Sequence, residues 1–185
     1  MASCWYSGCW YSGSRSPRPR SGRSRARPES IPHPSDPTTW ADFLRSQAEA
    51  LLAADFIETV TLTGARLYIQ AVIEHASRRI RVLGATAHPR AAWVTQAARN
   101  LVMDLQDAGS NARYLIRDRD GKYPALFDEI LADTGITVVR SGVQVPRMNA
   151  IMERWVRTCR RELLDRTLIW NQPHLLHALR EYEAF

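Results

Sequence analysis

The sequence is poor in lysine, cysteine and long apolar runs, and each shortage excludes a class of protein. Lys122 is the only lysine among the 25 basic residues, and arginine supplies the rest. The three cysteines, Cys4, Cys9 and Cys159, imply no disulfide framework, and none pairs with a histidine at the spacing of a zinc site. No apolar run approaches the roughly 18 residues of a membrane span, and the N-terminus lacks the apolar core of a signal peptide. We therefore expect a soluble protein of a reducing intracellular compartment, with no membrane partner.

The positive charge is concentrated in the first 39 residues. The formal net charge is +6, and residues 1–40 carry six arginines against Glu29 and Asp36. Serine, arginine, proline and glycine dominate residues 1–39 and leave almost nothing to bury, which predicts a disordered tail. Arginine suits bidentate phosphate contacts, so this tail could hold DNA nonspecifically. The same composition arises when a truncated or frame-shifted gene reads through unrelated sequence, and we favour that second interpretation.

Residues 40–185 are expected to form one folded domain, because 45% of the chain is hydrophobic and the periodicity changes at Trp40. Apolar residues at helical spacing predict a first helix that runs from Trp40 to Leu52 and leads into a strand. The further predicted strands are Asp55–Leu62, Leu67–Glu74, Arg79–Thr86, Arg113–Ile116 and Ile136–Arg140. Four further helices are predicted. The first starts at Pro89 and ends by Gly109, the second covers Leu126–Leu131, the third covers Asn149–Arg166, and the last begins at Asn171.

This order of elements predicts an α/β fold. The first three strands are joined by short turns, so a three-strand meander is the simplest arrangement. The later strands alternate with helices, which favours parallel pairing. We therefore expect a mixed five-stranded sheet, a meander followed by two parallel strands, with helices flanking it. The last helical pattern continues to the end of the sequence, so we interpret residues 40–185 as a core truncated at its C-terminal end.

An aspartate in the first strand is the first sign of chemistry. Asp55 alternates with Phe56 and Val60, so its carboxylate is expected on the opposite face of the sheet. Strands are poor in aspartate, and an acidic group beside a packed sheet is costly unless a cation or hydrogen bonds compensate it. Taken alone, Asp55 is still compatible with a purely structural role.

Two further acidic residues follow at a distance. Asp118 comes directly after the fourth predicted strand, where the alternative is a surface turn held by ion pairs, and Asp120 is a rival for the same role. Glu153 lies on the third long helix, on a polar face with Asn149, Arg157 and Arg160. The core stripe of that helix is predicted to be Ile151, Trp155, Cys159 and Leu163. The structural alternative for Glu153 is a solvated ion pair with Arg157, worth only a few tenths of a kcal/mol.

The segments "ADF", "LIRDRDGKY" and "PRMNAIMERW", which contain Asp55, Asp118 and Glu153, resemble the catalytic core of retroviral-type integrases. The resemblance is specifically to the transposases of bacterial insertion sequences, the DDE superfamily, and covers about residues 40–185. It implies a ribonuclease-H-like fold. Aligning Tyr123 with an aromatic residue of the family puts Asp118 at the ligand position. Asp120 then stands where the family commonly has glycine, which is a departure from its pattern.

The resemblance also implies an activity, DNA transposition or integration by phosphodiester cleavage and strand transfer. Asp55, Asp118 and Glu153 would be the catalytic residues and the ligands of two Mg²⁺ or Mn²⁺ ions, an arrangement suited to charge on both the attacking and the leaving oxygens. Arg160 matches a basic residue that the family carries seven positions after its glutamate, and we assign it to DNA. We assign Arg157, Arg147 and Asn149 to DNA as well.

The expected partners are DNA, as element ends and target, and other subunits. Related proteins carry an N-terminal helix-turn-helix region that this sequence lacks, so a homo-oligomer or a partner subunit would have to supply end recognition. The expected location is the bacterial cytoplasm, in association with the nucleoid. Two alternatives stay open: a catalytically inactive remnant that at most binds DNA nonspecifically, and a different nuclease of the same fold that cleaves without joining.

Overall fold

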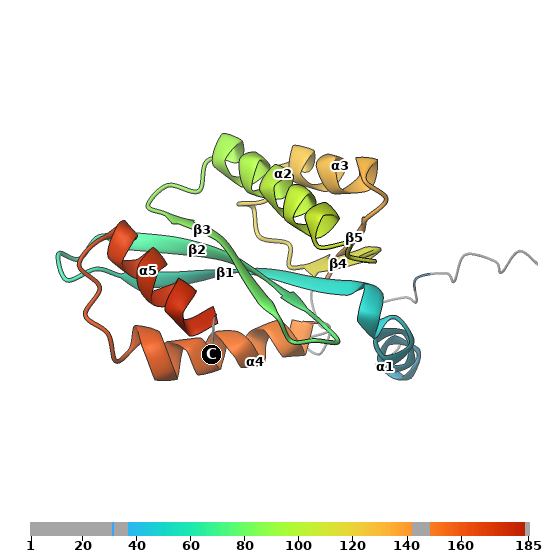
Figure 1. Ribbon diagram of the computed structural model, residues 1–185, viewed down its shortest axis with the longest axis horizontal. Coiled ribbons are helices and arrows are strands. Elements are labelled where there is room, and N and C mark those ends of the chain that lie inside the picture. The colour runs from blue at the N-terminus through green and yellow to red at the C-terminus, as the bar shows by residue number, and fades with distance from the viewer. Residues whose placement is uncertain (1–30, 32–36, 142–148, 184–185) are drawn as a thin grey trace, which may run out of the picture. The chain divides into compact units, whose positions relative to one another are not determined.

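Figure 1 shows a computed structural model of the chain. It describes residue 31, residues 37–141 and residues 149–183. Most of the predicted tail (1–39) and the predicted DNA contact Arg147 lie outside these residues. None of the helices in the described ranges is long and apolar enough to cross a membrane.

A five-stranded sheet forms the centre of the fold, with the strand order β3-β2-β1-β4-β5. Strands β1, β2 and β3 pair in antiparallel fashion, whereas β4 runs parallel to both β1 and β5. Their bounds are β1 Leu51–Val60, β2 Arg66–Glu74, β3 Ile80–Thr86, β4 Tyr114–Arg117 and β5 Thr137–Arg140. The predicted meander followed by two parallel strands is therefore confirmed.

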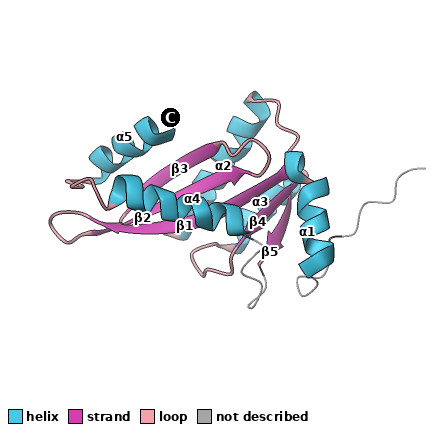
Figure 2. Cartoon of the chain, turned by 90° about the horizontal axis from the view of Figure 1, so that it is seen from below, coloured by secondary structure: helices cyan, strands magenta, loops and turns pink. Residues whose placement is uncertain are grey.

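Helices cover both faces of this sheet (Figures 1 and 2). Their bounds are α1 Pro37–Ser46, α2 Ala91–Asp107, α3 Ala125–Asp133, α4 Ala150–Cys159 and α5 Gln172–Glu183. On one face, Leu52 and Ala54 of β1 pack in the same cluster as α2 and α3. On the other face, Leu51 and Ala53 pack with α1 and α4. The period-2 alternation of β1 thus decides which helices each side chain meets.

The predicted first helix is too long. Helix α1 ends at Ser46, a short 3-10 turn, η1, covers Ala48–Ala50, and Leu51 and Leu52 already belong to β1. The spacing of these leucines also fits a helical face, but the two are buried in clusters on opposite sides of the sheet. Two adjacent residues that are both fully buried on opposite faces require a strand, so tertiary packing overrides the helical pattern.

The helix that carries Glu153 changes its winding after Cys159. A π-helical turn, η3, covers Arg160–Leu164, and the Asp165 N–H donates to the Arg160 carbonyl over five residues at 2.8 Å. The predicted core stripe is only partly right. Cys159 is buried, whereas Ile151, Trp155 and Leu163 are half-buried. The inserted residue accounts for the burial of Leu164 in place of Leu163, because it rotates the side chains that follow it, which uniform helical periodicity does not anticipate.

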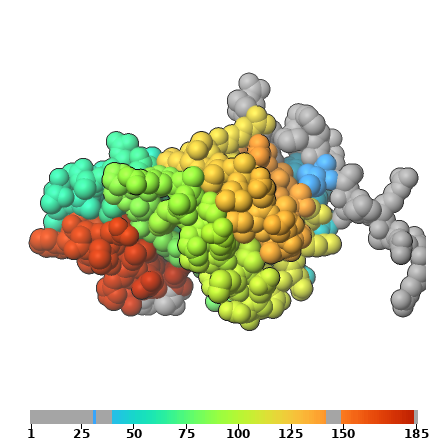
Figure 3. Space-filling model, turned by 90° about the horizontal axis from the view of Figure 1, so that it is seen from above, coloured from blue at the N-terminus to red at the C-terminus, as the bar shows by residue number. Residues whose placement is uncertain are grey.

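The end of the described chain packs on the antiparallel side of the sheet. The Val82 N–H of β3 donates to the Glu183 carboxylate, and the Gln172 side-chain amide donates to the Ala85 carbonyl at 2.8 Å. The Leu62 N–H, in the β1–β2 turn, donates to the Ile169 carbonyl at 2.8 Å. Figure 3 shows this C-terminal segment in red beside the β1–β2 turn in teal. Helix α5 therefore satisfies backbone groups along the outer edge of β3.

A buried arginine joins β4 to α3. Arg117 is only 4% exposed, and its Nε and Nη2 donate to the two carboxylate oxygens of Asp128 at 2.9 and 2.7 Å. Its Nη1 donates to the Asp118 carbonyl at 2.8 Å, and its guanidinium lies 4.7 Å from the centre of the Tyr123 ring. Although burial favours the neutral acid, the hydrogen bonds from Arg117 and Arg140 hold the pKa of Asp128 below its ordinary value.

Replacing Asp128 by Ala should destabilise the fold, because it leaves the Arg117 guanidinium buried without its carboxylate. We expect a loss of about 3 kcal/mol in the free energy of unfolding, measured by urea denaturation. The matched control is Glu129→Ala, which removes an exposed carboxylate from the same helix and should change stability by less than about 0.5 kcal/mol. Equal stabilities for the two variants would show that the pair contributes nothing to the fold.

Candidate active site

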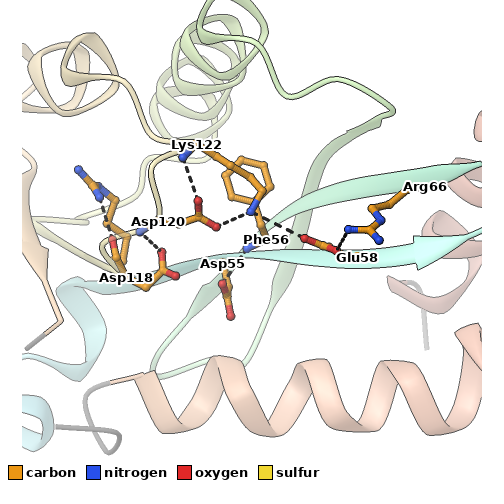
Figure 4. Close-up of polar contacts among 8 residues, drawn as sticks. Asp55, Phe56, Glu58, Arg66, Asp118, Asp120 and Lys122 are labelled. Carbon is orange, nitrogen blue, oxygen red and sulfur yellow. Dashed lines mark hydrogen bonds and ion pairs between the residues drawn. The ribbon is translucent and has the colours of Figure 1, made fainter. Parts of the chain in front are cut away.

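The parallel pairing of β1 and β4 brings Asp55 next to Asp118. The last paired residues of these strands are Ala54 and Arg117, and the two aspartates are the next residues along each strand. Asp55 belongs to the same alternating set as Ala53 and Ile57, which pack on the face that α4 covers. Figure 4 shows the Asp55 carboxylate directed from β1 toward that helix. The predicted position of Asp55, on the face opposite Phe56, is therefore correct.

The pKa of Asp55 is changed by its burial and by the charged groups around it. Burial, and to a smaller extent the negative charges of Asp118, Asp120 and Glu153, raise the pKa of Asp55 to about 6. A hydrogen bond from the Phe56 N–H at 2.8 Å opposes this rise without cancelling it. Four carboxyl groups from three different segments of the chain therefore interact, and their mutual repulsion is not compensated at Asp55.

The contacts of Lys122 distinguish Asp118 from Asp120, the two candidates for the second acidic position. Both carboxylate oxygens of Asp120 accept hydrogen bonds from Lys122, one from its backbone N–H at 2.9 Å and one from its ammonium at 2.6 Å. Burial disfavours the charged form of Asp120, but the bonds to Lys122 outweigh it and lower the pKa of Asp120. The carboxylate of Asp118 accepts only the Asp120 N–H, at 3.2 Å, among the described residues. Asp118 thus has the more available oxygens, as Figure 4 illustrates.

Sequence reasoning missed this role of Lys122. Its ammonium lies 3.9 Å from a carboxylate oxygen of Glu58 and 5.6 and 5.2 Å from the ring centres of Phe56 and Tyr68. These contacts keep the ammonium on the α2 side of β1, away from the face that carries Asp55. The only signal in the sequence was the position of the one lysine, two residues after Asp120.

Glu153 lies in the first turn of α4 and is exposed. The alternative interpretation paired it with Arg157, but Glu153 takes part in no ion pair within the ranges that the structure covers. Its carboxylate is therefore available to a ligand. Arg157, on α4, and Arg160, at the start of η3, are both exposed and accessible to a large polyanion.

Asn149 lies differently from its prediction. It precedes α4, is only 8% exposed, and its side-chain amide donates to the Ala54 carbonyl at 3.4 Å. The side-chain oxygen is buried and has no hydrogen-bond partner in the part of the chain that is described. Asn149 therefore joins the start of α4 to β1 beside Asp55, and its amide is not on a surface that DNA can reach. Helical spacing placed Asn149 on the polar face with Glu153, Arg157 and Arg160 because it assumed that Asn149 lies inside the helix.

The side chains offer suitable ligands for a divalent cation without forming a closed cage. Asp55, Asp118 and Glu153 supply only carboxylate oxygens, which are the donors that Mg²⁺ and Mn²⁺ prefer. Burial and, to a smaller extent, neighbouring carboxylates raise the pKa of Asp55, and a bound cation would stabilise its charged form. In the described ranges, however, no three acidic, histidine or cysteine side chains are close enough together to hold one ion. The residue types and their charges fit, and cation binding would have to draw the carboxylates together.

Comparisons with known proteins identify the fold. No protein-family model matches the sequence, and no curated protein matches it. Among solved structures, the catalytic domain of Mos1 mariner transposase is similar, with a TM-score of 0.61 and 12% identity over 80% of this chain and 78% of that domain. The catalytic core domain of BIV integrase gives a TM-score of 0.50 and 17% identity over 71% of this chain and 81% of the core.

A third similar structure is the simian T-cell lymphotropic virus intasome in complex with a PP2A regulatory subunit, with a TM-score of 0.54 and 12% identity. The match covers 71% of this chain but only 47% of the viral chain. This chain thus has the fold of retroviral integrase catalytic cores and of a transposase catalytic domain, and the predicted ribonuclease-H-like architecture is confirmed. At these identities the similarity shows the fold alone.

The half-buried carboxylate of Asp55, repelled by its acidic neighbours, should make the protein less stable than an amide would. The folded-state pKa of about 6 lies above the ordinary value of 3.8, so ionisation of Asp55 weakens the fold as the pH rises from about 4 to about 6. Asp55→Asn should therefore stabilise the metal-free protein at pH 7, by about 2 kcal/mol after allowing for screening by solvent. The gain should vanish below pH 4, where Asp55 is protonated in both states.

Thermal unfolding from pH 3.5 to pH 8 in the presence of EDTA measures this difference. Asp107→Asn, which neutralises the last residue of α2 far from the site in the sequence, is the control and should show no such dependence. A difference between parent and Asp55→Asn that does not change with pH would show that Asp55 has an ordinary pKa.

Proposed function

We propose that this chain is the catalytic core of a DDE-type transposase or integrase, which cleaves phosphodiester bonds of DNA and transfers the strand with the help of divalent metal ions. The observation that carries the proposal is the half-buried Asp55, adjacent to Asp118 across parallel strands and under the electrostatic influence of Glu153 from α4. The fold shared with integrase and transposase catalytic domains supports it. One solved Mos1 catalytic domain contains magnesium together with raltegravir, and we extend the metal to this chain.

In this proposal Asp55, Asp118 and Glu153 hold two Mg²⁺ or Mn²⁺ ions. Bound there, the ions would activate water or a 3′ hydroxyl as the nucleophile and stabilise the leaving oxygen. Asp55 contributes from the most rigid position, because β1 is the central strand and the Phe56 N–H fixes one of its oxygens. Lys122 engages Asp120, which leaves Asp118 as the ligand. Asn149 acts as a positioning residue that ties the start of α4 to the Ala54 carbonyl.

The DNA contacts are proposed for Arg157 and Arg160, which are exposed on the same helical segment as Glu153. Arg147 belongs to the same proposal and lies outside the described residues. We also propose that the core works as a homo-oligomer or with a subunit that recognises element ends, because phosphate contacts position a protein without identifying bases. Because the proposed partner is DNA, we propose that the protein is associated with the bacterial chromosome in the cytoplasm. We also propose that it originates from a bacterial insertion sequence.

Cleavage of element-end DNA with Mg²⁺ or Mn²⁺ tests the assignment. Asp55→Asn and Asp118→Asn should each reduce the rate by roughly a thousandfold, because metal ions contribute several kcal/mol to such reactions. DNA binding in EDTA should persist in both variants. The matched control is Asp120→Asn, which removes the rival carboxylate and should retain most of the activity. Loss of cleavage in Asp120→Asn with full activity in Asp118→Asn would reverse the two assignments.

The alternative is a catalytically inactive remnant that at most binds DNA nonspecifically. The observation that favours it is the separation of the acidic side chains, since no three of those described are close enough for one ion. The departure at Asp120, where the family commonly has glycine, points the same way. Absence of divalent-dependent cleavage by the parent protein in both metals, under conditions in which it is folded, would establish the remnant. Cleavage without any joined product would instead indicate a nuclease.

A further inference from the structure

A cavity of about 510 Å³ lies beside the acidic residues, on the α3 side of the sheet. Its lining residues are Arg117, Arg119, Asp120, Gly121, Tyr123, Ala125 and Arg140. Arg117 and Arg140 are the last residues of β4 and β5, and Arg119 follows Asp118. The cavity therefore lies at the same edge of the sheet as Asp118. Arg119, Gly121 and Arg140 are exposed, which opens the cavity to solvent. None of its lining residues was assigned to DNA in the proposal above.

Arg119 and Arg140, the two exposed arginines of the cavity, each have one guanidinium nitrogen fixed by a hydrogen bond. The Nε of Arg119 donates to the Ser141 carbonyl at 3.1 Å, and one Nη of Arg140 donates to Asp128 at 2.8 Å. Since Ser141 directly follows Arg140, the Arg119 guanidinium is held at the end of β5. Their remaining N–H groups have no partner among the described residues. An arginine fixed in this way loses less conformational entropy when it binds an anion.

The charge balance leaves the arginines that line the cavity with a surplus of positive charge. Asp120 is engaged by Lys122, and Asp128 is already paired through both oxygens with the buried Arg117. The side chain of Arg140 is 59% exposed although it also contacts Asp128. Arg117 and Arg140 both contact Asp128, so they share its single negative charge. Arg117, Arg119 and Arg140 together carry three positive charges, and Asp128 balances one of them, which leaves about two positive charges in surplus at the cavity.

We infer that this cavity binds phosphate groups of the DNA strand that passes the acidic residues, with Arg119 and Arg140 as the contacting residues. The inference rests on the proposed function and adds a second phosphate-binding surface on the opposite side of Asp118 from Arg157 and Arg160. The planar guanidinium fork matches two oxygens of a phosphodiester. Arg117 does not contact the DNA and acts as a positioning residue, because all three of its nitrogens are used within the protein.

The salt dependence of DNA binding tests the site. Fluorescence anisotropy of a random-sequence duplex is measured with the full chain in EDTA over a series of NaCl concentrations. The double variant Arg119→Ala/Arg140→Ala should bind about tenfold more weakly, and its slope of log K against log salt should be shallower by about 2, close to one for each lost phosphate contact. The control Arg99→Ala removes an exposed arginine from α2 and should leave the slope unchanged. All these proteins have the same residues 1–30, so any DNA binding by the arginines of that segment is the same in each.

Two further variants keep the test decisive if the double variant is unstable in thermal unfolding. Arg119→Glu changes a side chain whose one described bond is to a carbonyl, and it should weaken binding more than Arg119→Ala. Arg119→Lys should retain the slope, because a lysine keeps the charge. A double variant with the affinity and slope of the parent, an equal loss in Arg99→Ala, or a parent that does not bind the duplex would each overturn the inference.

Cleavage assays separate this inference from the proposed function. Binding that depends on Arg119 and Arg140 in a protein that never cuts DNA would leave the phosphate site in place and remove the catalytic role. Metal-dependent cleavage by the parent, together with unchanged DNA binding in the double variant, would support the catalytic role and exclude the phosphate site.

Discussion

The parallel pairing of β1 with β4 is the constraint on which the site depends. These strands are far apart in the sequence, and their register aligns Ala54 with Arg117, so that the following aspartates stand side by side. The pairing is held by side chains that are buried on both faces, including Leu52, Ala53, Leu115 and Ile116. A slip of one residue would move Asp55 to the other face of the sheet, away from α4. The apolar pattern of these strands therefore fixes the positions of the charged groups.

The interaction between Arg117 and Asp128 extends this constraint to the loop after β4. The bidentate pair anchors α3, and the third contact of the guanidinium holds the Asp118 carbonyl. The backbone that carries Asp118 is thus fixed from the α3 side of the sheet, while its carboxylate is left to the site. Buried ion pairs are an expensive way to gain stability, but they specify geometry well. Asn149 has the corresponding role on the other face, between α4 and β1.

Much of this arrangement could be predicted from the sequence. The meander and the parallel pairing of the later strands follow from the order of strands and helices along the chain, and the face of Asp55 follows from period-2 alternation; the structure confirms all three. Local patterns were insufficient where tertiary packing decides. Leu51 and Leu52 fit a helix as well as a strand, and the π-helical turn at Arg160 has no signature in apolar spacing. The burial of Asn149 depends on its contact with β1, and the position of the Lys122 ammonium depends on its contacts with Glu58, Phe56 and Tyr68. A single sequence does not reveal such contacts between distant segments.

The packing of α5 against β3 has a consequence for solubility. An outer strand with unpaired N–H and C=O groups is a template on which another chain can add a strand. Here Glu183 and Gln172 occupy hydrogen-bonding groups of Val82 and Ala85, so that the helix stands where an incoming strand would dock. The residues that close this edge lie at the very end of the described chain. A frayed α5 would leave the sheet open to stepwise growth into fibrous aggregates.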